Sequence, residues 1–321
     1  MSNNSSMTLA CQMLAASGCA YSITGTTYQP PINDPFGPAI GWTTSGNTPI
    51  VVTGGFANED AALVGTITLA GTTTTAIVVA FEGTVPPSPI TLDSALAWLQ
   101  NLLASPEYVA DLHGTVHSGI YASVNNIYTT LLSTIADLQQ ANPNAPLYIT
   151  GHSKGGGMAS LFAAMVHWTA NDTLQPSAVY TFASPMIGLP DFIASFPSSV
   201  SVSRYENTLD QVPFLAPSDS YIATLKSNEH ILPHVTLVLD GIVLLLEQFA
   251  GMGYVPLGEL FYINGTSITN PGTNPCANQI GLTLAEGTPG LMTVLNAHSH
   301  LCSYGYMTGT CNSMGVCPIS N

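Results

Sequence analysis

The pentapeptide Gly151-His152-Ser153-Lys154-Gly155 has the spacing G-x-S-x-G. An apolar, strand-like run over residues 146–150 precedes it, and small and apolar residues that suit a helix follow over 156–164. Strand, tight turn and helix is the context in which this spacing forms a nucleophile elbow. The glycines permit the sharp turn, because a Cβ there would collide with the neighbouring strand or helix. We therefore predict that Ser153 is a nucleophile at the carboxyl edge of a sheet, next to a helix N-terminus that favours negative charge.

Such a serine needs a base to remove its proton and an acid to orient that base. In the usual chain order for this kind of elbow, the acid follows the serine and the histidine comes last. Asp210, just past a predicted strand end, is the best candidate for the acid, and Asp191 is the second choice. The chain has eight histidines. We set aside those that precede the serine, lie in the helix after it or lie in an apparent insertion. His298 and His300 remain as candidates for the base.

The apolar pattern places this serine in a layered α/β protein. Strands are predicted over 67–70, 75–81, 146–150, 178–182, 200–205 and 259–263, and helices over 5–17, 91–104, 119–140 and 156–164. This alternation favours a sheet with helices on both faces. No repeat or low-complexity linker divides the 321 residues, so we expect a single domain over 1–321.

Composition narrows the possible partners. Apolar residues make up 46% of the chain and charged residues only 7%, with a net charge of −15. The basic residues are Lys154, Arg204 and Lys226. So few cations form no basic patch, which argues against binding to nucleic acid or to anionic lipid headgroups. No transmembrane segment is expected, because the most apolar stretch, 234–255, is interrupted by Asp240 and Glu247.

The six cysteines lie near the two ends of the chain. An even number in this arrangement suits disulfides in a secreted protein, although buried free thiols in a cytosolic protein are the alternative. Without a C-x-x-C pair no zinc site is predicted, and we expect neither a metal nor another cofactor. The first residues lack the pattern of a secretory signal, so either the signal has been removed or the protein is not exported.

Six motifs, in order, resemble those of the class 3 lipase family, the filamentous-fungal lipases and feruloyl esterases. They are Val79–Thr84, Val116–Ile120, Gly151–Gly156, Thr181–Pro185, Asp210–Pro213 and His300–Cys311. The resemblance implies an α/β-hydrolase fold, a central mostly parallel sheet flanked by helices. It also implies a lid over about 85–104, which contains Leu96, Trp98 and Leu99. An extra helical insertion over about 217–254 has no counterpart in the family, and could be a second cap over the acyl pocket or extra core packing.

The same resemblance implies roles for single residues. Ser153 would be the nucleophile, Asp210 the acid and His300 the base, since the spacing from His300 to the last motif's cysteine favours it over His298. Thr84 would supply its backbone N–H and hydroxyl to the oxyanion hole, and Lys154 its backbone N–H. In the family a cysteine at the position of Cys311 is joined to the N-terminal helix, so the resemblance implies Cys11 or Cys19 as its partner.

Three positions depart from the family's pattern. Glu82 replaces the usual arginine, so any ion pair made by that arginine is missing or inverted. Lys154 replaces a leucine after the nucleophile. Ser303 stands where the family has an aromatic residue.

The function implied is hydrolysis of carboxylic esters through an acyl-enzyme, as in a secreted triacylglycerol lipase acting at an oil–water interface. The apolar residues of the lid segment and the low charge favour a water-insoluble, uncharged substrate. A feruloyl or other soluble carboxylesterase is the alternative, and a non-catalytic lipid-binding module on the same scaffold is a third reading. The oligomeric state does not follow from the sequence.

Overall fold

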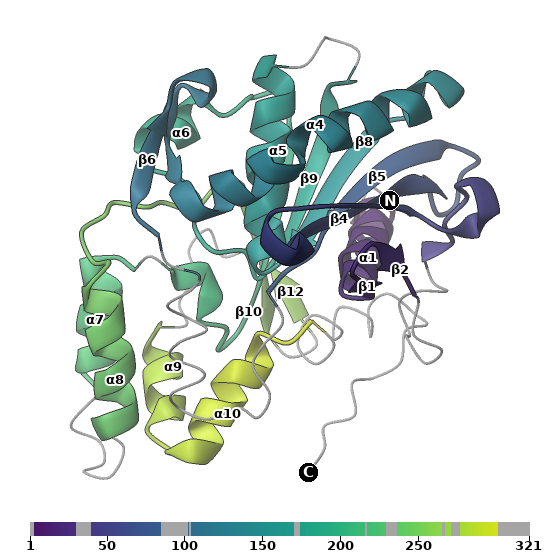
Figure 1. Cartoon of the computed structure of the whole chain (residues 1–321). Helices are drawn as coiled ribbons and strands as arrows, with labels where there is room; N and C mark the ends of the chain where they lie inside the picture. The colour runs from purple at the N-terminus through teal and green to yellow at the C-terminus, as the bar shows by residue number, and fades with distance from the viewer. Residues whose placement is uncertain are drawn as a thin grey trace.

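The computed structural model describes residues 3–29, 40–84, 102, 104–169, 174–215, 217–228, 236–264, 267–270 and 277–300. Among these residues, an eight-stranded sheet forms the centre of the molecule, with the order β12-β11-β10-β9-β8-β5-β4-β3 (Figure 1). Its strands are β3 (Ile50–Gly54), β4 (Asp60–Thr68), β5 (Thr75–Phe81), β8 (Leu147–His152), β9 (Pro176–Phe182), β10 (Ser201–Asn207), β11 (Glu259–Asn264) and β12 (Ser267–Thr269). The five strands β5, β8, β9, β10 and β11 are parallel to one another. At the two edges, β3, β4 and β12 pair antiparallel with their neighbours. The sheet is therefore mostly parallel, as predicted.

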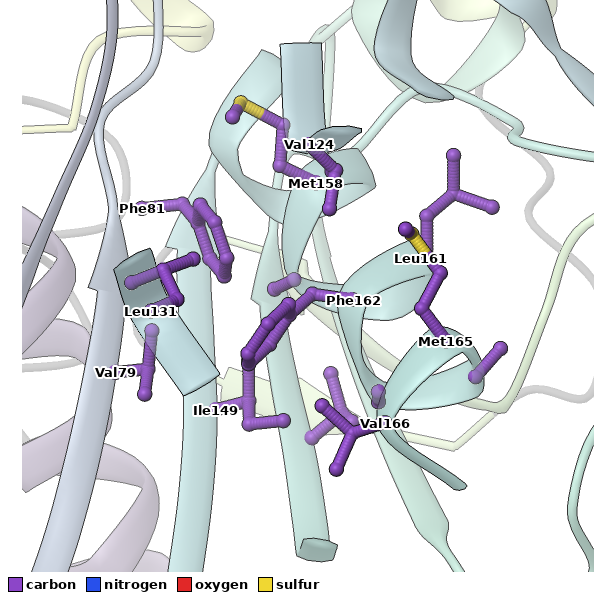
Figure 2. Close-up of a cluster of buried hydrophobic side chains, with 14 of the residues drawn as sticks. Val79, Phe81, Val124, Leu131, Ile149, Met158, Leu161, Phe162, Met165 and Val166 are labelled. Carbon is purple, nitrogen blue, oxygen red and sulfur yellow. The ribbon is translucent and has the colours of Figure 1, made fainter. Parts of the chain in front are cut away.

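Helices cover both faces of the sheet. Helix α1 (Asn3–Ala20) packs on one face, and α4 (Ser118–Ala141) and α5 (Lys154–Thr169) pack on the other. Along β5, Phe81 belongs to the core under α4 and α5, whereas Ala80 belongs to the core under α1, because successive side chains of a strand point to opposite faces. Figure 2 shows Phe81 beside Phe162 of α5, with ring centroids 5.4 Å apart. This packing fixes α5, and with it the turn before α5, against the middle of the sheet.

A group of helices lies beyond the carboxyl edge of the sheet (Figure 1). Its members are α7 (Asp219–Lys226), α8 (Thr236–Glu247), α9 (Ala277–Leu284) and α10 (Thr288–Ala297). They share a third core, separate from the two cores on the sheet faces, to which Leu225, Leu246 and Leu284 contribute fully buried side chains. The apolar helix predicted in the insertion is confirmed as α8. The sequence did not predict α9 and α10, which are only 8 and 10 residues long and carry glycine inside.

The remaining elements are short. They are β1 (Ile23–Thr24), β2 (Thr27–Tyr28), β6 (Pro106–Val109), β7 (Gly114–His117), α6 (Pro190–Ser195) and the 3₁₀ turns η1 (Ser45–Asn47), η2 (Phe56–Asn58), η3 (Ala110–Leu112) and η5 (Val212–Phe214). β6 and β7 form an antiparallel hairpin. Within the described parts of the chain, no helix has the length and apolarity to span a bilayer.

Two predicted elements either differ from the structure or lie largely outside the described residues. A strand over 67–70 is wrong in its limits, because β4 starts at Asp60 and a turn with Gly71 at φ 73° follows Leu69. The helix predicted over 91–104, with Leu96, Trp98 and Leu99 of the expected lid, lies outside the described residues except at Leu102 and Ala104.

Candidate active site

The predicted strand, turn and helix around Ser153 are confirmed. Ser153 lies between β8 and α5 and has φ 58°, a left-handed conformation that is uncommon for a residue with a side chain. Its N–H donates to the carbonyl of Phe182 on β9 at 2.9 Å, and its own carbonyl accepts from Gly156 at 2.9 Å. The serine is fully buried, and its Oγ has no hydrogen-bond partner among the described residues.

The glycines of the motif are required by contact with the backbone. A Cβ on Gly151 would lie 2.1 Å from the carbonyl oxygen of Gly155, and a Cβ on Gly155 would lie 2.4 Å from that of Phe81. Backbone atoms cannot move aside as a flexible side chain can. The turn therefore brings the start of α5 into direct contact with the end of β5, where the candidate oxyanion residue Thr84 follows.

A carboxylate and an imidazole meet at the carboxyl edge of the sheet. Asp210 follows β10, is fully buried, and accepts a hydrogen bond from the N–H of Val212 at 3.0 Å. The Nδ1 atom of His298 lies 3.0 and 3.1 Å from the two carboxylate oxygens of Asp210. Because an ionised carboxylate only accepts, Nδ1 carries the proton in this pair and Nε2 is the basic nitrogen. The ring of His298 lies 4.8 Å from that of His152, the residue before Ser153.

This geometry disagrees with the choice of His300 as the base. The Nε2 atom of His300 lies 3.0 Å from the hydroxyl of Ser17 and 3.0 Å from the carbonyl of Leu14, both on α1. Its ring also fills the space beside Gly18, where a Cβ would be 2.6 Å from Cε1. Burial lowers the pKa of His300 to about 4, so it is a neutral packing residue at neutral pH. The family spacing pointed to His300, but the structure brings His298 to Asp210.

The ring of His152 contacts the rings of both His298 and His300. Its Nδ1 lies 2.7 Å from the hydroxyl of Tyr21, and its ring lies 5.1 Å from that of His300. Burial, with the neighbouring His298 and His300, holds the pKa of His152 well below its usual value. The candidate base therefore faces a neutral ring rather than a second cation.

The two residues expected in the oxyanion hole flank the elbow. Thr84 lies three residues beyond the end of β5, and Lys154 is the first residue of α5. Gly83 passes so close to the elbow that a Cβ would lie 2.6 Å from the carbonyl oxygen of His152. Thr84 is therefore held beside the turn that carries Ser153.

The cation at position 154 has a buried partner. Lys154 Nζ lies 2.8 Å from Asp60 Oδ1, and the side chains are 22% and 3% exposed. The other oxygen of Asp60 accepts from Asn126 Nδ2 of α4 at 2.8 Å. Glu82 stands where the family has arginine and lies close to Lys154. Burial raises the pKa of Glu82 to about 7, while the charge of Lys154 acts to lower it. The structure thus places the acid at position 82 near the cation of position 154, whose ion pair is with Asp60.

A small apolar pocket adjoins the Asp210–His298 pair. Besides these two residues and Gln211, its lining is aliphatic: Val212, Ile242, Leu291, Val294 and Leu295. One of these side chains comes from α8 in the insertion and three come from α10. The insertion therefore packs in the third core, and its Ile242 contributes to the wall of this pocket, while a cap over the acyl pocket stays a prediction.

The other candidates have different surroundings. Asp191 lies in the first turn of α6 and accepts from Thr115 Oγ1 at 2.7 Å and from the N–H of Phe192 at 2.8 Å. Cys11 is disulfide-bonded, whereas Cys311, which the resemblance joins to Cys11 or Cys19, and Ser303 lie outside the described residues.

Sequence reasoning missed Asp60, Tyr21 and Ser17. None lies in a motif, and their roles depend on contacts between distant parts of the chain. The signal that could have led to Asp60 was Lys154 itself, because a lone cation beside a buried turn requires a nearby carboxylate. In the part of the chain that the structure describes, no group of three or more His, Cys, Asp or Glu residues is arranged to hold a metal ion.

Comparison with known proteins agrees with this fold. Residues 78–220 match the model of the family described as Lipase (class 3). The secreted mono- and diacylglycerol lipase 1 of Fusarium solani is 32% identical over 32% of this chain and 30% of its own length. A lipase of Rhizomucor miehei is 31% identical over 38% of this chain and 34% of its own. The solved structure of lipase II from Rhizopus niveus has a TM-score of 0.59 at 18% identity, covering 86% of this chain and 89% of its own.

The resemblance to the class 3 lipase family is therefore confirmed over residues 78–220, and the chain has the α/β-hydrolase fold. That matched segment contains the elbow, Thr84 and Asp210, but ends before His298 and His300. The aligned part of the chain spans about a third of the length of the curated relatives it matches.

Proposed function

We propose that this protein is a serine hydrolase that cleaves carboxylic esters of lipids through an acyl-enzyme. Ser153 is the nucleophile, His298 the base and Asp210 the acid. The observation that carries the proposal is the contact of the Asp210 carboxylate with His298 Nδ1 beside the strained serine turn. That order and arrangement of serine, acid and histidine is the one used by hydrolases with this elbow.

Each residue has a distinct task in this reaction. Asp210 holds His298 in the tautomer whose Nε2 is basic and stabilises the imidazolium that forms when the serine proton is taken. Ser153 Oγ attacks the ester carbonyl, and the proton then passes from His298 to the leaving alcohol. Water, activated by the same histidine, releases the acid and restores the serine. The backbone N–H groups of Thr84 and Lys154 bind the oxygen that becomes negative in the tetrahedral intermediate.

The surroundings of the site favour a lipid substrate. The pocket beside His298 is lined by five aliphatic side chains and suits a hydrocarbon group better than a polar or aromatic acid. Lys154 is neutralised by Asp60, so it is a poor ligand for an anionic group. An acylglycerol, which is uncharged and carries hydrocarbon chains, fits both properties. The Fusarium relative is named as a mono- and diacylglycerol lipase, which makes partial glycerides a substrate to test alongside triacylglycerol.

Secretion is part of the same proposal. The bonded state of Cys11 suits an oxidising compartment, and the Fusarium relative is named as a secreted protein. We infer that the protein works outside the cell on lipid at an interface with water.

The experiment measures initial rates on tributyrin and triolein across the solubility limit of the former, with Ser153→Ala as the control. We expect Ser153→Ala to lower kcat by at least about 10⁴-fold, because no acyl-enzyme can form. A phosphonate that reacts with activated serines should label the wild-type protein at Ser153 alone.

The outcomes separate the remaining readings. A rate that rises steeply once an emulsion forms supports a lipase, whereas saturation below the solubility limit and no action on triolein indicates a soluble carboxylesterase. Retained activity in Ser153→Ala, or labelling at another residue, would refute the proposed nucleophile. No hydrolysis of any ester by wild-type protein would indicate a lipid-binding module.

A further inference from the structure

The ion pair between Lys154 and Asp60 joins three parts of the molecule at the nucleophile turn. Lys154 is the first residue of α5, Asp60 the first residue of β4, and Asn126, which holds the second carboxylate oxygen, lies on α4. Both oxygens of Asp60 are thus engaged at 2.8 Å, one by each helix. We propose that Lys154 and Asp60 are a pair of positioning residues that fix the peptide between Ser153 and Lys154, so that its N–H points at the developing oxyanion.

The surroundings of Asp60 are shaped around its carboxylate. Gly55 has φ 76°, and a Cβ there would lie 2.6 Å from Asp60 Oδ2. A Cβ on the preceding glycine, Gly54, would lie 2.8 Å from the carbonyl oxygen of Asn126. These two glycines let the backbone at the end of β3 approach the carboxylate and α4 closely. The carboxylate therefore has a fixed location, and a side chain tied to it is fixed as well.

The peptide that needs fixing is the one between Ser153 and Lys154. Ser153 has a strained φ of 58°, so a change of this angle toward the ordinary region would lower the energy of the turn. A small rotation of this peptide would turn the N–H of Lys154 away from the substrate oxygen, and catalysis depends on donors that are aimed in advance. The lysine side chain leaves from the Cα next to that N–H. Anchoring its ammonium on Asp60 restrains this Cα from a second direction.

The pair also controls local charge. Glu82 follows the end of β5, two residues before Thr84, and Lys154 acts to lower its pKa. Without Lys154, the carboxylate of Asp60 would be buried without its cation, next to a site where negative charge must develop. When Lys154 is present, the Lys154–Asp60 pair has no net charge. The developing oxyanion is therefore not repelled by the carboxylate of Asp60.

The inference rests on the proposed function, because it assumes that Ser153 is acylated. Its test is a double-mutant cycle on kcat and KM with dissolved p-nitrophenyl butyrate, using Lys154→Met, Asp60→Asn and the double variant. Rates are expressed per active site titrated with the serine-directed phosphonate, so that loss of folded protein does not count as loss of rate. Lys226→Met is the matched control, because it breaks an exposed ion pair instead of a buried one. The side chains of Lys226 and its partner Glu247 are 44% and 39% exposed.

We expect each single variant to lower kcat by about a hundredfold, the cost of one misaimed oxyanion donor, with KM changed by less than about threefold. The double variant should lose about as much as one single variant, far less than the product of the two losses, because the second change removes a group that has already lost its partner. Lys154→Arg, which keeps the charge, should retain at least about ten times the kcat of Lys154→Met. Lys226→Met should leave both constants within about twofold.

Several results would overturn the positioning role. These are a kcat within about threefold of wild type in Lys154→Met, losses that multiply in the double variant, or a Lys154→Arg variant as slow as Lys154→Met. If a Met or Asn variant does not fold, Asp60→Glu decides, since it keeps the charge and changes only the position of the carboxylate. A kcat close to wild type in Asp60→Glu would then refute the need for precise anchoring. Failure of the proposed function is distinguishable, because Ser153→Ala would then remain active.

Discussion

The turn that carries Ser153 and the segment that carries His298 lie in different kinds of surroundings. The turn sits between a central strand and a helix that packs against the middle of the sheet, and its glycines touch backbone atoms. The histidine follows α10, one of the helices that form a separate core beyond the carboxyl edge. At the turn, steric contacts within the motif and with the adjoining end of β5 leave no room for a Cβ on Gly151 or Gly155. After α10, the choice between two histidines depends on which helix each one meets.

His298 and His300 illustrate this difference, since only one residue separates them. His298 caps α10 and faces Asp210, whereas His300 faces α1, at the other end of the sequence. The spacing to a later cysteine supported His300. Spacing along the sequence, however, carries no information on which surface each imidazole packs against. A motif therefore predicts a residue reliably when the elements of the motif position it, and less so when distant elements do.

The largest expected effect comes from separating the two histidines. We expect His298→Ala to lower kcat by at least about 10⁴-fold, as for loss of the base in a serine triad. His300→Ala should lower kcat by less than about tenfold, or ~1.4 kcal/mol in barrier, because it removes packing against α1 and no catalytic group. The measurement is kcat on a dissolved ester, with circular dichroism to verify folding. A severe loss in His300→Ala with a mild one in His298→Ala would reverse the assignment.

The second prediction concerns the steric character of the turn. Gly155→Ala should lower the free energy of unfolding by at least about 3 kcal/mol, because its Cβ would meet the carbonyl of Phe81, which cannot move aside. Gly119→Ala in α4 is the control. There a Cβ would have its nearest contact at 3.4 Å, and alanine favours helix, so stability should stay within about 1 kcal/mol or rise. Urea unfolding of both variants provides the test, and equal stability would show that the turn relaxes freely.

The third prediction uses the acid sensitivity of the contact between His300 and α1. The pKa of His300 is about 4 in the folded protein against 6.5 for the free side chain, so below pH 6.5 the unfolded chain binds a proton that the folded chain does not. The free energy of unfolding should therefore fall as pH drops from 6.5 toward 4, by roughly 2 kcal/mol between pH 7 and 4.5 from this residue alone.

His300→Gln removes this titration. Its stability at pH 7 should be lower than that of wild type, because the contacts with Ser17 and Leu14 are altered, but its loss between pH 7 and 4.5 should be smaller by roughly 2 kcal/mol. Urea unfolding at the two pH values measures the difference. An unchanged pH dependence would mean that His300 is charged in the fold, contrary to its burial against α1.

Much of the central architecture followed from the sequence. The strands β5, β8, β9, β10 and β11 were recognisable as apolar runs, and α4 and α5 as helical patterns, because burial on a sheet imposes regular spacing. The short helices α9 and α10 were not predicted, since they are stabilised by the third core rather than by their own composition.

The sequence by itself determined the turn that carries Ser153, since the glycines beside this serine and the strand and helix around them leave little freedom. It also located Asp210, just beyond a strand that ends at the same edge of the sheet. Only the tertiary structure decided which histidine meets that carboxylate and what neutralises Lys154. The physical reason is that these contacts join residues 88 and 94 positions apart, and burial of a charge or a ring depends on what the fold brings beside it.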